Sequence, residues 1–67
     1  MDIYTQHIIA PESLGRIITD WMMTNEVGGE ALAGQLGISR PTLIKMKQGK
    51  EVRMTLSRYR EICDFFF

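Results

Sequence analysis

The chain has 67 residues, of which 45% are hydrophobic and 24% are charged, and its formal net charge is zero. A chain of this length makes one domain with a small core that buries roughly 60% of the unfolded surface, so a partner subunit is expected to add stability. The apolar content is too high for a disordered chain. No apolar stretch reaches the roughly 20 residues that cross a bilayer, so we expect a cytoplasmic protein without a membrane partner.

Cysteine and histidine, which often carry catalysis or bind metals, are scarce in the chain. The chain has one cysteine, Cys63, and one histidine, His7, at opposite ends of the sequence. This excludes an internal disulfide and argues against a zinc site, and it supplies neither a Cys–His nor a Ser–His–acid arrangement. Cys63 is expected to be an inert core thiol. We therefore expect no enzymatic activity, metal ion, cofactor or small-molecule ligand.

Residues 11–26 have the pattern of a first helix. Pro11 and Glu12 suit a first helical turn, and Gly15 either weakens the helix or permits a close backbone approach. The apolar side chains recur at helical spacing and form one stripe, made of Leu14, Ile17, Ile18, Trp21 and Met22.

Two short helices are predicted over residues 30–36 and 40–48. Gly37 ends the first helix, as glycine does where a left-handed residue is needed, and Ser39 caps the second. Two short helices joined by a turn of about three residues make a helix-turn-helix unit. The positions expected to hold this unit together are Ala33, Gly37, Ile38, Leu43 and Met46.

The remaining segments are a predicted linker over residues 50–54 and a fourth helix capped by Thr55. Residues 1–10 are interpreted as an N-terminal arm or short element, which could be a strand, a helical turn or an arm. The expected fold class is therefore all-α, with four or five helices in a single compact domain over residues 11–67. The inward stripe of the fourth helix is expected to be Leu56, Tyr59, Ile62, Cys63 and Phe66.

The charges are unevenly distributed along the chain. Residues 1–30 hold five acidic side chains and one arginine, whereas residues 31–60 hold seven basic side chains and one glutamate. Such asymmetry predicts an electropositive face on an otherwise acidic body. Helical geometry turns four side chains of the third helix outward, on the face that would enter a DNA major groove: Arg40, Ile44, Lys45 and Gln48.

The segment from residue 27 to residue 50 reads VGGEALAGQLGISRPTLIKMKQGK. It closely resembles the phage-repressor and Cro-type helix-turn-helix family, also called XRE-type, and the resemblance covers roughly residues 12–66. The resemblance implies a lambda-repressor-like fold that binds double-stranded DNA. Together with helical geometry it suggests base-reading roles for Arg40, Pro41, Ile44 and Lys45. The candidates for phosphate binding, with Arg53 added from the linker, are Ser39, Thr42, Lys47, Gln48, Gly49, Lys50 and Arg53.

The chain departs from the family pattern at two positions. Gly28 replaces the usual capping Ser or Thr of the second helix, and Gly29 replaces a Gln that usually contacts phosphate. The first change implies a weaker helix start, and the second puts one backbone contact in doubt. Arg58 and Arg60 are expected on the outer side of the last helix, where we favour solvation, with pairing to Glu61 or Asp64, over contact with DNA.

These observations predict a sequence-specific transcription regulator that acts by occluding its operator. One recognition helix reads too few bases to select a genomic site, so a homodimer on a palindromic operator is expected. The dimer interface is assigned mainly to Phe65, Phe66 and Phe67, although these residues could instead fold back over the core. The alternatives are an antitoxin, an excision-directing phage protein, or a helix-turn-helix used as a protein-interaction module.

Overall fold

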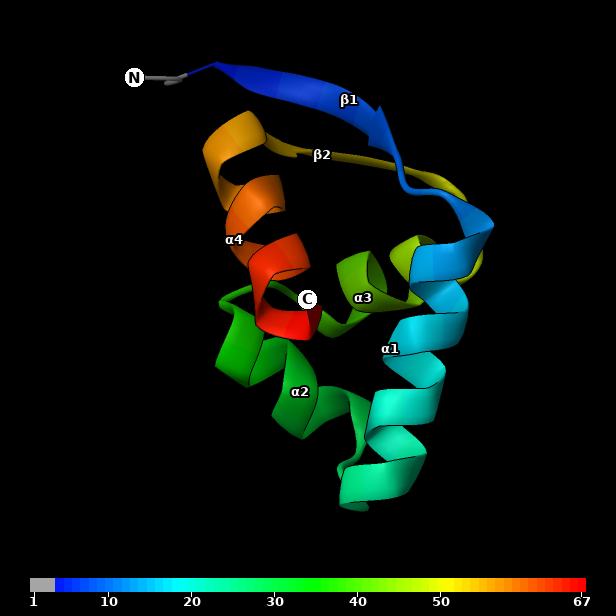
Figure 1. Ribbon diagram of the computed structural model, residues 1–67. Coiled ribbons are helices and arrows are strands. Elements are labelled where there is room, and N and C mark those ends of the chain that lie inside the picture. Colours follow the sequence, from blue (N-terminus) through cyan, green and yellow to red (C-terminus); the bar gives the residue numbers. More distant parts are fainter. Residues whose placement is uncertain (1–3) are drawn as a thin grey trace.

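The computed structural model describes residues 4–67, and in this part of the chain it holds four helices and one two-stranded antiparallel sheet (Figure 1). The expected all-α class is therefore wrong. Residues 1–3 of the predicted N-terminal arm lie outside the described residues. The elements in chain order are β1 (Thr5–Ile9), α1 (Glu12–Asn25), α2 (Gly29–Leu36), α3 (Arg40–Lys47), β2 (Glu51–Thr55) and α4 (Leu56–Phe66).

The sheet consists of the segment predicted as a linker and part of residues 1–10, for which a strand was one of three alternatives. The linker predicted over residues 50–54 is largely strand β2, in which Val52 and Met54 are buried while Glu51 and Arg53 are exposed. This alternation is the side-chain period of a strand with one face on the core. Its partner is β1, so the strand alternative is the correct one for residues 5–9. Figure 1 shows β1 on the outside of the sheet and β2 between β1 and the helices.

The predicted helices are confirmed, with ends that differ by one residue. Helix α1 covers residues 12–25 instead of 11–26, because Glu26 adopts a left-handed conformation (φ 52°) and ends it. Helix α2 begins at residue 29 and α3 ends at residue 47. The helices and β2 enclose one hydrophobic core, whose buried residues are Ala10, Leu14, Ile18, Leu32, Ala33, Leu36, Leu43, Met46, Val52, Met54 and Ile62.

Gly15 allows α1 and α3 to cross at close range. A Cβ atom at this position would lie 2.5 Å from the backbone oxygen of Lys47 and 3.3 Å from its Cα. Both neighbours are backbone atoms at the end of α3, which cannot move aside as a flexible side chain would. Of the two alternatives left open for Gly15, close backbone approach is the one the structure shows.

Helix α4 begins as predicted at a threonine cap. The Thr55 Oγ1 atom accepts a hydrogen bond of 3.2 Å from the backbone N–H of Arg58. Ile62 is buried, and Tyr59, Cys63 and Phe66 are half-buried against the core. Burial raises the pKa of the Tyr59 hydroxyl above its ordinary value, and the neighbouring Cys63 adds to the shift. Along residues 4–67, none of the helices is both long enough and apolar enough to traverse a bilayer.

Candidate nucleic-acid interface

The turn between α2 and α3 is fixed by its backbone conformation and its hydrogen bonds. Gly37 adopts a left-handed conformation (φ 70°), and its N–H donates to the carbonyl of Gly34 at 3.2 Å. The next N–H, of Ile38, donates to the carbonyl of Ala33 at 3.0 Å, and Ile38 is half-buried. Ala33 is itself only 2% exposed. These bonds satisfy carbonyl groups at the end of α2 and set the direction in which α3 leaves the turn.

Helix α3 starts at a serine cap that involves two hydroxyl groups. The Ser39 Oγ atom accepts from the backbone N–H of Thr42 at 3.3 Å, and the two side-chain hydroxyls lie 2.8 Å apart. Only one of the two hydroxyls donates in that contact. The hydrogen of the other one remains for a further acceptor. Both residues were expected to contact phosphate, and this geometry is compatible with a contact from one of them.

The opposite sides of α3 differ sharply in burial. Leu43 and Met46 are 1% and 0% exposed and fix the helix on the core. The four base-reading candidates share the solvent side of the helix, because positions four apart lie on one face. These exposed residues are Arg40, Pro41, Ile44 and Lys45.

A pocket of about 360 Å³ opens at the N-terminal end of α3. We call it the turn pocket, because the turn before α3 forms one wall and the other walls come from β2 and the start of α4. Its lining holds two arginines, three hydroxyl side chains and no carboxylate. The lining residues are Gly37, Ile38, Ser39, Thr42, Arg53, Met54, Thr55 and Arg58.

A second pocket, of about 490 Å³, lies at the other end of α3, against α1. We call it the α1 pocket. Here Lys47 and Gln48, both candidates for phosphate binding, face a wall that contains two carboxylates. The charges in this pocket balance, and its lining residues are Glu12, Gly15, Arg16, Thr19, Asp20, Lys47 and Gln48.

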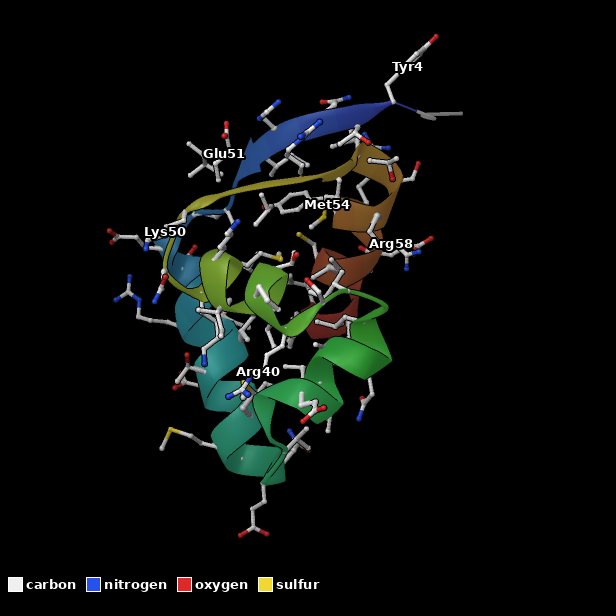
Figure 2. All side chains as sticks on the ribbon, turned by 180° about the vertical axis from the view of Figure 1, so that it is seen from behind. Tyr4, Arg40, Lys50, Glu51, Met54 and Arg58 are labelled. Atoms are coloured by element: carbon white, nitrogen blue, oxygen red, sulfur yellow. The ribbon has the colours of Figure 1, made fainter. Side chains whose placement is uncertain are left out.

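Two more of the phosphate candidates follow α3 directly. The N–H of Gly49 donates to the carbonyl of Met46 at 3.3 Å, so it is already used within the chain. Gly49 adopts a left-handed conformation (φ 71°), which turns the chain toward β2. Lys50 is exposed, and Figure 2 shows Lys50 and Arg58 on either side of α3. A phosphate contact at this point therefore depends on the ammonium group of Lys50.

The three C-terminal phenylalanines, which were assigned to a dimer interface, are placed differently from one another. Phe65 and Phe66 make edge-to-face contacts with Trp21, at ring-centroid distances of 5.2 and 6.0 Å. Phe66 is half-buried, whereas Phe65 is 41% and Phe67 is 79% exposed. Within this short segment, Phe66 therefore folds back against the core, whereas Phe65 and Phe67 remain exposed to a partner. Trp21 is itself half-buried and packs against the hydrophobic core.

Arg58, which was expected to be solvated on the outer side of the last helix, has a side chain that is 46% exposed, but sequence reasoning did not predict its closeness to the turn before α3. Its guanidinium lies against the turn, since a Cβ atom at Gly37 would come within 2.8 Å of Arg58 Nη1. The expected pairing with Glu61 is present at 3.5 Å. Nothing in the local pattern of α4 indicates this placement, because it depends on how α4 packs against α2 and α3. Among the described residues, no group of three or more His, Cys, Asp and Glu side chains gathers as a metal site would.

Comparison with known proteins adds no relative, since no protein-family model, curated protein or solved structure matches the chain. The resemblance to the phage-repressor and Cro-type family therefore stays a prediction that depends on residues 27–50.

Proposed function

We propose that the protein is a sequence-specific DNA-binding transcription regulator of the phage-repressor and Cro kind, which inserts α3 into the major groove. The observation that carries this proposal is the exposed side of α3, which holds Arg40 and Lys45 between two pockets with basic side chains. An α-helix with its side chains is roughly 10–12 Å across. Because the major groove is about 12 Å wide, α3 fits into it with its exposed side toward the base edges.

Each exposed side chain of α3 has a distinct role in this proposal. Arg40 and Lys45 donate hydrogen bonds to the O6 and N7 atoms of guanine. Ile44, which is 40% exposed, contacts a thymine methyl group. Pro41 has no N–H and contributes only shape, so Arg40 and Lys45 carry the hydrogen-bonded readout.

The regulator acts as a homodimer on a palindromic operator in the cytoplasm and works by occlusion. Two copies of α3 in successive major grooves, one helical turn apart, double the number of bases that are read. The exposed rings of Phe65 and Phe67 supply apolar surface for the two-fold contact. Sedimentation of the protein with and without its operator measures this directly, and a monomer in both conditions would contradict the dimer.

A second candidate function is a protein-interaction module, for which the exposed Phe65 and Phe67 and the zero net charge are the supporting observations. The dependence of binding on salt separates the two functions. A protein that contacts several phosphates loses affinity for a duplex steeply as the salt concentration rises. The logarithm of its binding constant falls with the logarithm of the salt concentration, with a slope of about −0.9 per contact. Apolar binding to a protein partner barely changes over the same salt range. A shallow slope, or no binding to DNA, would favour the interaction module.

A further inference from the structure

Arg58 belongs to the first turn of α4, yet its side chain reaches the turn between α2 and α3. Its Nη1 atom occupies the space next to Gly37, at 2.8 Å from where a Cβ atom would stand. The Thr55 cap fixes its backbone through the 3.2 Å hydrogen bond. The guanidinium therefore lies beside the turn before α3, where its Nη1 atom also pairs with Glu61 at 3.5 Å, and the side chain as a whole is 46% exposed.

A second arginine shares the turn pocket. Arg53 comes from β2, where strand alternation turns it away from the buried side chains of Val52 and Met54. The acidic neighbour of Arg53 on this strand, Glu51, lies 3.2 Å from His7 Nδ1 on β1. Two cations that belong to separate elements thus line one pocket that no carboxylate lines.

The hydroxyl groups of the turn pocket complement this charge. Thr55 Oγ1 accepts from a backbone N–H and so keeps its own hydrogen, and one hydrogen of the Ser39–Thr42 pair remains as well. Guanidinium groups and hydroxyl donors are the partners that a phosphodiester oxygen takes in proteins. The chemistry of the pocket therefore matches a singly charged phosphodiester.

We propose that Arg53 and Arg58 together hold one backbone phosphate of bound DNA in the turn pocket, which makes α4 part of the DNA interface. This assignment rests on the proposed function, since it requires α3 to lie in the major groove next to the DNA strand that carries this phosphate. The ion pair of Arg58 with Glu61 must open or be shared. The two side chains of that pair are 46% and 70% exposed, so solvent already weakens the pair and the phosphate competes with it readily.

The test measures how DNA affinity depends on salt concentration in variants of α4. Fluorescence anisotropy with a short labelled duplex of mixed sequence gives the slope of log binding constant against log salt concentration. It is measured for the wild type, Arg58→Ala, Arg58→Lys and Arg60→Ala. We expect Arg58→Ala to make the slope shallower by about 0.9, the contribution of one phosphate contact. Arg58→Lys keeps the slope because it keeps the charge. Arg60→Ala, which removes an exposed arginine of the same helix outside the pocket, also keeps it.

A second pair of variants covers the case in which Arg58→Ala does not fold, which circular dichroism reports. Arg53→Ala removes the other guanidinium from β2 and is expected to reduce the slope by a similar amount. Glu61→Gln releases Arg58 and removes a negative charge, so affinity for the duplex should rise about threefold at low salt.

The outcomes separate this assignment from the proposed function. A steep slope that is the same in the wild type, Arg58→Ala and Arg53→Ala overturns the phosphate contact and leaves DNA binding intact. A flat slope already in the wild type overturns both. If inorganic phosphate raises the melting temperature of the wild type but not of Arg58→Ala, while their duplex slopes agree, the pocket binds free phosphate and the DNA assignment is wrong.

Discussion

The two ends of α3 carry different charge environments, although phosphate candidates were predicted at both. At the N-terminal end, β2 and α4 contribute Arg53 and Arg58 to the turn pocket, which no carboxylate lines. At the C-terminal end, α1 places Glu12 and Asp20 opposite Lys47. The element that packs beside each end therefore decides the local charge. A net charge of zero for the whole chain conceals one end whose pocket is lined by basic side chains without a carboxylate and one whose lining charges balance.

The largest effect is expected from breaking the contact that holds α1 against the C-terminal end of α3. Gly15→Ala places a methyl group 2.5 Å from the backbone oxygen of Lys47, and such overpacking should lower the free energy of unfolding by about 3 kcal/mol. Urea denaturation measures the loss.

Gly34→Ala is the matched control for this substitution. Gly34 also lies in a helix, but a Cβ atom there meets nothing within 4 Å. The control should therefore stabilise the protein by about 0.5 kcal/mol through helix propensity. Equal effects of the two substitutions would show that α1 does not press on the end of α3.

A smaller effect is expected from removing a side chain in the middle of α3, and it concerns the preference for one DNA sequence over another. Lys45→Ala should lower discrimination at one base position of each half-site by about 2 kcal/mol, because a base contact is lost. Lys50→Ala, beyond the helix, should weaken binding to all sequences alike. Competition binding with a panel of single-base operator variants measures both, and a uniform loss for Lys45→Ala would remove it from base readout.

The smallest effect is expected at the C-terminal end of α3, where the charges of the α1 pocket balance. Asp20→Asn removes one carboxylate from the α1 pocket, where Lys47 and Gln48 face it. Affinity for a duplex at low salt should rise about threefold, since less repulsion opposes the phosphate backbone. Glu26→Gln changes the same charge outside the pocket and serves as the control. A rise of the same size in both variants would mean that only the net charge matters.

The helices could be predicted from the sequence because their signals are local. The apolar stripe from Leu14 to Met22, the Ser39 and Thr55 caps and the Gly37 stop each lie within a few residues of the element they define. These features set the helix-turn-helix unit and the exposed side of α3 before any packing is known.

The sheet and the turn pocket could not be predicted in the same way. Val52 and Met54 alternate with Glu51 and Arg53, which is a strand signal, but it covers only five residues. Its partner β1 is distant in sequence, with Ile8 opposite Val52, and the pairing forms only when the core brings the two segments together. The position of Arg58 over Gly37 likewise depends on the packing of α4. Contacts of this range leave no pattern in a local window of sequence.

The most direct measurement of the central claim is an NMR titration of the ¹⁵N-labelled protein with a short DNA duplex. If α3 enters the groove, the largest amide shift changes fall between Ser39 and Lys50, with further changes at Arg53 and Arg58. The aromatic contacts around Trp21 should change little. Changes confined to the C-terminal phenylalanines, or no changes at all along α3, would contradict the account.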